Sequence, residues 1–98
     1  MELQAFKAML KADKLPSGIA GCLAALWYDG KNDWEEAHRI AQDIDDRNGA
    51  WVHAYLHRKE GDIGNAKYWY TRAGRTMPLH SLDQEWDEIV TEFLKKKG

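Results

Sequence analysis

The stretch WVHAYLHRKEGDIGNAKYWYTRAG, residues 51–74, has the pattern of two helices joined by a tight turn. Gly61 is suited to end the first helix, because glycine readily adopts the left-handed conformation that follows many helix C-termini. Asp62 offers a carboxylate to the free amides that open the next helix, and Gly74 marks where that helix stops. The segment therefore predicts a helical hairpin, and this hairpin decides the fold class.

A second hairpin is predicted upstream, because the chain repeats itself with a shift of 29 residues (from position 37 to position 66). The shift superimposes four pairs of positions: Asp33 on Asp62, Ala37 on Ala66, Leu23 on Val52 and Ala25 on Ala54. Helix–turn–helix units of this period indicate an α-solenoid, in which each hairpin buries its apolar face against the next. We expect a single domain over residues 1–98, with an N-terminal helix in 1–16, a first hairpin in 17–48, a second hairpin in 49–80 and a C-terminal capping helix in 81–98.

The remaining helix boundaries are predicted from capping residues and turn dipeptides. They are Ser17 as the cap of a second helix, Asn32 with Glu35 and Ser81 with Gln84 as capping boxes, and Asn48-Gly49 as a break before the fourth helix. Alternating strand patterns are absent from the sequence. The sequence thus predicts an all-α fold of about six helices, which the short loops make antiparallel.

Composition narrows the classes of function. With 14 basic and 16 acidic residues, the net charge of −2 gives no reason to expect nucleic acid as a partner. No apolar run approaches the roughly 18 residues that a membrane span needs, and the N-terminal segment lacks the pattern of a secretory signal. Cys22 is the one cysteine, so no internal disulfide can form. We therefore expect a cytoplasmic protein.

Five positions of the second hairpin resemble those of tetratricopeptide repeats, and the match extends over roughly residues 17–80. These positions are Ala54, Ala66, Tyr70, Ala73 and Pro78. The string NAKYWYTRAG, residues 65–74, is also similar to the Sel1-like variety of this repeat. The whole chain resembles a group of small proteins that carry the strings DWxxAHxIAQ and WVHAYLHRxEGD, a likeness that implies no particular activity.

The likeness to tetratricopeptide repeats implies a non-enzymatic module that binds a protein or peptide on the concave side of its hairpins. Carried onto this chain, the partner-binding positions are Trp51, Tyr55, Arg58 and Lys59. At about 100° per residue, the first three of these lie on one side of the helix, and aromatics beside a guanidinium suit an extended peptide. Two alternatives stay open: a terminal helix covers this face, since so short an array must cap itself, or a homodimer covers it.

A second hypothesis concerns the histidines. His53, His57 and Glu60 are spaced i, i+4 and i+7 and share one helix face, and the repeat register brings His38 toward them from the preceding hairpin. Three imidazoles and a carboxylate can hold zinc with a position left for water, so the alternative function is a metal- or small-molecule-binding protein, including a catalytic one. The competing interpretation is structural, because histidines also carry hydrogen bonds between packed helices. Otherwise no cofactor is expected.

Overall fold

The computed structural model describes residues 1–97, and these form six α-helices and one short 3-10 turn without any strand. The elements are α1 (Leu3–Ala8), η1 (Met9–Lys11), α2 (Gly21–Gly30), α3 (Trp34–Gln42), α4 (Arg47–Glu60), α5 (Ile63–Ala73) and α6 (Leu82–Lys97). The predicted all-α fold of six helices is confirmed. No helix among the described residues is long and apolar enough to cross a membrane.

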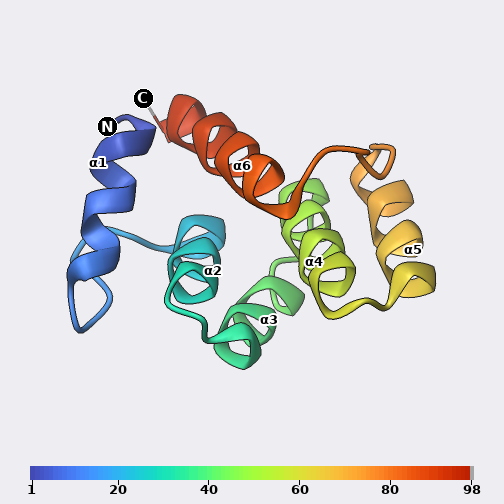
Figure 1. Ribbon diagram of the computed structural model, residues 1–98, viewed down its shortest axis with the longest axis horizontal. Helices are drawn as coiled ribbons and strands as arrows, with labels where there is room; N and C mark the ends of the chain where they lie inside the picture. The colour runs from blue at the N-terminus through green and yellow to red at the C-terminus, as the bar shows by residue number, and fades with distance from the viewer. Residues whose placement is uncertain (98) are drawn as a thin grey trace.

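The four central helices form two hairpins that stack side by side (Figure 1). α2 packs along α3 and α4 along α5, while α3 packs against α4 and joins the two hairpins. Small side chains permit the close approach of these helices, and the fully buried ones include both members of two repeat pairs. These are Ala25 with Ala54 and Ala37 with Ala66, all without exposed surface.

The last helix lies across the first helices of both hairpins (Figure 1). α6 packs on α2 and α4, and α1 also packs against it, with Lys7 paired to Asp87. The ring of Phe93 meets Trp51 of α4 edge-on at 5.7 Å, and the indole of Trp86 donates a hydrogen bond to the Leu26 carbonyl of α2 at 3.1 Å. α6 therefore covers the face of α4 on which the sequence predicts partner binding.

Four predicted helix boundaries are confirmed. Gly61 and Gly74 follow α4 and α5 with left-handed φ angles of 89° and 74°. Asp62 caps α5 by accepting a hydrogen bond from the amide of Asn65 at 3.3 Å. Ser81 and Gln84 form the predicted capping box, in which the Gln84 amide donates to the Ser81 hydroxyl and the Ser81 amide donates to the Gln84 side chain.

Two helices begin at other residues than predicted. α2 starts at Gly21 rather than after Ser17, because the chain first makes a turn in which the Ile19 amide bonds to the Pro16 carbonyl at 3.2 Å. α3 is capped by Asp33, whose carboxylate accepts from the amide of Glu36 at 3.2 Å. The predicted capping box of Asn32 and Glu35 is therefore wrong by one residue, and Asn32 belongs to the turn, with a φ angle of 66°.

The predicted break at Asn48-Gly49 is also wrong, because both residues lie in the first turn of α4. Asp46 caps this helix by accepting from the Gly49 amide at 2.8 Å. Gly49 does not form a turn but lets the backbone of α4 pass close to Ile44. A Cβ atom at position 49 would lie 2.1 Å from the carbonyl oxygen of Ile44.

Candidate functional site

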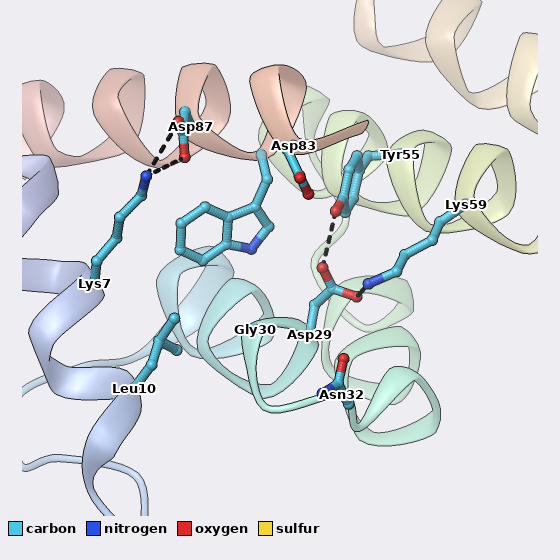
Figure 2. A pocket seen from close by; sticks show the side chains of 10 residues that line it. Lys7, Leu10, Asp29, Gly30, Asn32, Tyr55, Lys59, Asp83 and Asp87 are labelled. Atoms are coloured by element: carbon cyan, nitrogen blue, oxygen red, sulfur yellow. Dashed lines mark hydrogen bonds and ion pairs between the residues drawn. The ribbon is translucent and has the colours of Figure 1, made fainter. Parts of the chain in front are cut away.

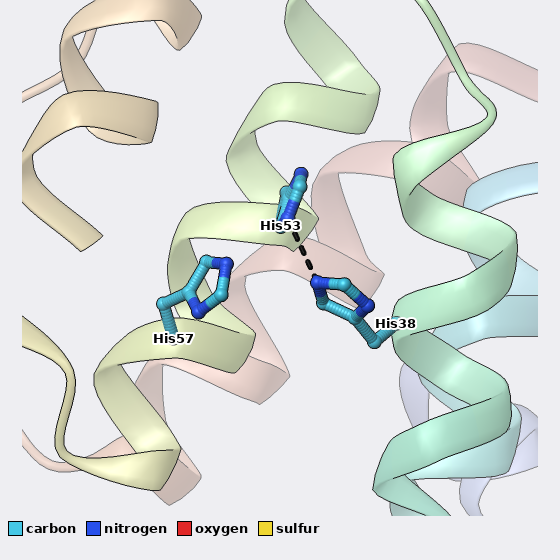
Figure 3. Close-up of side chains that lie close together, drawn as sticks. All are labelled: His38, His53 and His57. Atoms are coloured by element: carbon cyan, nitrogen blue, oxygen red, sulfur yellow. Dashed lines mark hydrogen bonds between the residues drawn. The ribbon is translucent and has the colours of Figure 1, made fainter. Parts of the chain in front are cut away.

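Three histidines meet in the space between α3 and α4 (Figure 3). His53 and His57 stand one turn apart on α4, and His38 faces them from α3. The Nε2 atoms of His38 and His53 are 2.9 Å apart, and each ring offers a nitrogen such that all three lie within 4.8 Å of one another. The repeat register therefore predicted the approach of His38 correctly, whereas metal binding stays a prediction.

Two tryptophans form walls that orient the imidazoles. Trp34 stacks on His38 with ring centroids 4.8 Å apart, and its indole is held by a hydrogen bond to the Leu56 carbonyl at 2.8 Å. Trp69 of α5 stacks on His53 with centroids 4.1 Å apart. The cluster is thus enclosed by residues of three helices, and its rings have little freedom to turn away.

Glu60 holds the third ring in place. Its carboxylate lies 2.7 Å from Nδ1 of His57, which leaves Nε2 of that ring free for a ligand. Figure 3 shows one nitrogen of His57 turned toward the other two rings. A carboxylate on the far nitrogen is the usual support of a metal-binding histidine, because it fixes the tautomer and makes the ligand more basic. Glu60 is thus placed to position the ring of His57, and its role as a fourth ligand stays a prediction.

A second group of ligand atoms surrounds His57, together with Glu60 and Asp62. Here the carboxylate of Asp62 already accepts hydrogen bonds from the amide and the side chain of Asn65, at 3.3 and 2.8 Å. Asp62 thus caps the N-terminus of α5, and Glu60 holds the ring of His57. These two roles explain why the three side chains lie together. The group carries no separate site.

The surroundings favour neutral imidazoles. Burial, with smaller contributions from the neighbouring His38 and His57, lowers the pKa of His53 to about 4. Burial and His57 also lower the pKa of His38. A neutral imidazole keeps a lone pair on one nitrogen, which is the form that binds metal. At neutral pH the cluster can therefore offer ligands without first losing protons from these two rings.

The distances suit a small transition-metal ion. Zinc bonds to histidine nitrogens at 2.0–2.1 Å, so nitrogens in a tetrahedral site lie about 3.3 Å apart. The 2.9 Å between Nε2 of His38 and Nε2 of His53 differs from that value by a few tenths of an ångström. Small ring movements would therefore bring these two nitrogens to ligand distance, and the nitrogen of His57, within 4.8 Å of both, would have to move toward them. Three such ligands would leave one coordination position over.

The four residues predicted to bind a partner lie beneath or beside α6. Trp51 and Tyr55 are 3% and 2% exposed, and the side chains of Arg58 and Lys59 make ion pairs with buried carboxylates, to Glu85 at 2.8 Å and to Asp29 at 2.9 Å. The alternative in which a terminal helix covers this face therefore describes the structure. Binding of a partner by these residues stays a prediction, and it would require α6 to move.

A hollow of about 350 Å³ remains beside this covered face (Figure 2). Trp86 forms one wall, and the charged groups at its sides pair within the protein, Lys7 with Asp87 at 3.1 Å and Lys59 with Asp29. The buried carboxylate of Asp29 also accepts a hydrogen bond from Tyr55 at 2.9 Å. Because these bonds satisfy the buried carboxylate, the hollow gives weaker support for a ligand than the histidines do.

Sequence reasoning missed Trp69, Asp29 and Glu85. For Glu85 the signal was present, since this carboxylate sits inside the apolar stripe of the last helix and a charge at a core position needs partners. Nothing in the spacing along α5 indicated that Trp69 would stack on a histidine of another helix.

Comparisons with known proteins gave no match to a family model, to a curated protein or to a solved structure.

Proposed function

We propose that the protein binds one divalent transition-metal ion through His38, His53 and His57. The observation that carries the proposal is the convergence of three imidazole nitrogens within 4.8 Å of one another, in a cluster backed by two tryptophans. Imidazole is a preferred ligand of zinc, copper, nickel and iron, whereas magnesium and calcium prefer oxygen. The chemistry of the cluster therefore favours a transition metal.

Each residue has a defined role in this proposal. His38 and His53 would use the Nε2 atoms that now face each other at 2.9 Å, and the metal would replace their mutual hydrogen bond. His57 would use Nε2 while Glu60 holds its Nδ1 at 2.7 Å. Three protein ligands leave a position for water or a small molecule, the arrangement that distinguishes open from closed metal sites. The contacts described above support binding, and they assign no reaction.

Titration of the metal-free protein, prepared without an affinity tag, with zinc chloride tests the proposal. We expect one ion per chain by calorimetry and a rise in melting temperature, because a ligand that binds only the folded state stabilises it. His38→Gln and His57→Gln should abolish both effects. His80→Gln is the matched control, since His80 lies outside the cluster, 3.7 Å from Glu88. Zinc binding that is absent from the native chain, or equally strong in all three variants, would overturn the proposal.

A non-enzymatic role in binding a protein or peptide is a second candidate, within a cytoplasmic protein of tetratricopeptide- or Sel1-like hairpins. It is supported by the exposed Tyr68 of α5, which is 53% accessible and stands on the uncovered edge of the second hairpin. One form of this hypothesis is a homodimer formed through that edge. Sedimentation velocity over a range of concentrations tests it, and a single monomeric species throughout would exclude the dimer.

A further inference from the structure

The outer side of α5 carries a hollow that the metal proposal does not involve. Its volume is about 300 Å³, and it lies between α5 and the segment that leads to α6. The residues that line it are Lys67, Tyr70, Thr71, Arg75, Thr76 and Met77. We refer to these six residues as the basic hollow.

The basic hollow is positively charged, although the net charge of the whole chain is −2. Its lining contains two cations and three residues with hydroxyl groups but no carboxylate. The surrounding sequence agrees: no aspartate or glutamate occurs from Ile63 to Leu82, although acidic residues outnumber basic ones in the chain as a whole. Within the described residues, neither Lys67 nor Arg75 takes part in an ion pair. Positive charge without an internal partner therefore gathers at this place.

The guanidinium group of Arg75 is already fixed. It lies over the ring of Trp51 with 3.3 Å between Cζ and the ring centroid, and Trp51 is itself held between α4 and α6. A cation stacked on a buried aromatic ring loses less side-chain freedom when it binds an anion than a free arginine does. The stacking thus prepares Arg75 to pair with a carboxylate.

The architecture leaves this side of the molecule open. In a longer array the next hairpin would pack beside α5, but α6 turns back onto α2 and α4 instead (Figure 1). Apolar side chains accompany the charges: the partly buried Met77 lines the hollow, and Leu79, two residues later, is fully exposed. A surface of this kind suits a ligand that has both carboxylates and apolar side chains.

We propose that the basic hollow binds an acidic segment of a partner protein, with carboxylates of the partner paired to Lys67 and Arg75 and an apolar side chain placed against Met77. A polypeptide fits these features better than a nucleic acid does. Phosphate backbones need many cations along an extended surface, whereas the lining of the hollow supplies two.

Fluorescence anisotropy with two labelled peptides tests this proposal on the complete chain. The first peptide alternates glutamate and aspartate with leucine and phenylalanine, and the second has lysine at every acidic position. We expect saturable, salt-sensitive binding of the acidic peptide alone, and a Lys67→Glu/Arg75→Glu double variant should weaken it at least tenfold. A short DNA duplex of equal charge serves as a further probe and should bind more weakly than the acidic peptide.

The matched control is Lys11→Glu/Lys14→Glu, which changes the net charge equally at exposed positions near the N-terminus. Lys67→Glu alone leaves the Arg75 stacking intact, so it tests the hollow even if the double variant unfolds, and circular dichroism monitors the fold of each variant. The proposal is overturned by any of three results: no saturable binding at millimolar peptide, equal weakening in both charge-reversed pairs, or tighter binding of the DNA.

Discussion

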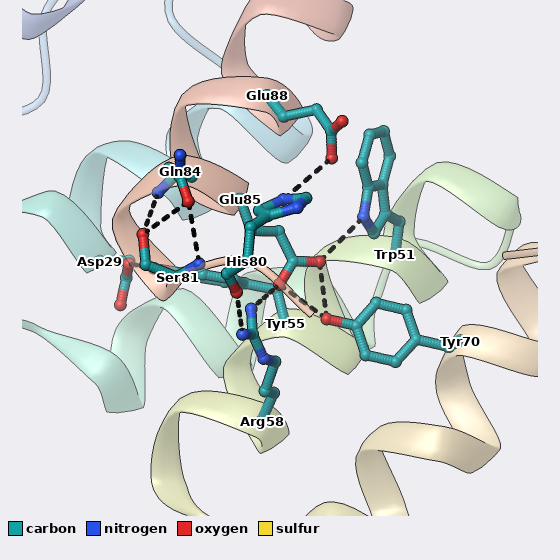
Figure 4. Close-up of polar contacts among 10 residues, drawn as sticks. All are labelled: Asp29, Trp51, Tyr55, Arg58, Tyr70, His80, Ser81, Gln84, Glu85 and Glu88. Carbon is teal, nitrogen blue, oxygen red and sulfur yellow. Dashed lines mark hydrogen bonds and ion pairs between the residues drawn. The ribbon is translucent and has the colours of Figure 1, made fainter. Parts of the chain in front are cut away.

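The hydroxyl of Tyr70 on α5 donates a hydrogen bond to the carboxylate of Glu85 on α6. The two carboxylate oxygens lie 2.8 and 2.6 Å from the hydroxyl oxygen (Figure 4). The same carboxylate pairs with Arg58 of α4 at 2.8 Å and accepts a hydrogen bond from the indole of Trp51 at 3.3 Å. Glu85 has no exposed surface. Burial and the bond to Glu85 raise the pKa of Tyr70, so the hydroxyl keeps its proton and continues to donate. One buried carboxylate therefore connects α4, α5 and α6.

Glu85→Ala should lower the free energy of unfolding by about 3–5 kcal/mol, because it leaves the Arg58 guanidinium without its charged partner inside the protein. Urea denaturation measures this value. Glu88→Ala, on the exposed side of the same helix, is the control and should change stability by no more than about 0.5 kcal/mol. Equal effects of the two substitutions would show that the buried network adds nothing to stability.

Two glycines inside helices should respond to alanine in opposite ways. Gly49→Ala places a Cβ atom 2.1 Å from the backbone oxygen of Ile44, and we expect a loss of roughly 1–3 kcal/mol as the backbone shifts. Gly64→Ala in α5 meets no atom within 4 Å, and it should raise stability by up to about 1 kcal/mol because alanine favours the helix. Thermal melts of both variants against the native chain measure the difference. A stable Gly49→Ala variant would contradict the close approach of α4 to Ile44.

The metal-free protein should lose stability as the pH falls through the range between the unfolded and folded pKa values of His53, about 6.5 and about 4. In that range the unfolded chain binds a proton that the folded chain excludes, so acid favours unfolding. The loss should amount to roughly 2–3 kcal/mol at pH 4.5. Melts in the presence of a chelator at pH 7.5 and pH 4.5 measure it, and His53→Gln separates this contribution from that of the carboxylates. An unchanged pH dependence in the variant would argue against a buried neutral imidazole.

Cys22 should react slowly with thiol reagents in the folded protein. Burial, with a smaller contribution from the negative charge of Asp46, raises the pKa of this thiol from 9.0 to about 11. Since the thiolate is the reactive form, its population at pH 8 falls by about a hundredfold relative to the unfolded chain. A disulfide reagent added with and without urea measures the two rates. Similar rates would show that the thiol is not buried as described.

Local chemistry predicted much of the fold. Gly61, Asp62, Gly74 and the box of Ser81 with Gln84 all act at the boundaries that their side chains or backbone freedom indicated. The errors arose where a residue type has two uses. Gly49 resembles a turn residue in sequence, yet its use is to let α4 approach the Ile44 carbonyl, a contact that no local pattern reveals.

The candidate site was partly predictable for a similar reason. The repeat register brought His38 to His53 and His57 correctly, because equivalent hairpins repeat the same packing. The burial of His53 depends on the packing of other helices, since α3, α5 and α6 surround much of α4. The packing of α6 over Trp51 could not be derived from the sequence, because the apolar stripe of α6 does not indicate which helices it will contact.

The position of α6 also orders events during synthesis of the chain. Both hairpins leave the ribosome before the helix that covers them, so the indole of Trp51 and the ring of Tyr55 stay accessible to water until α6 arrives. Contacts such as that of Trp86 with Leu26 join residues 60 positions apart, and such distant closures are slow. A nascent chain at this stage exposes an apolar surface to chaperones and proteases, and the packing of α6 buries that surface.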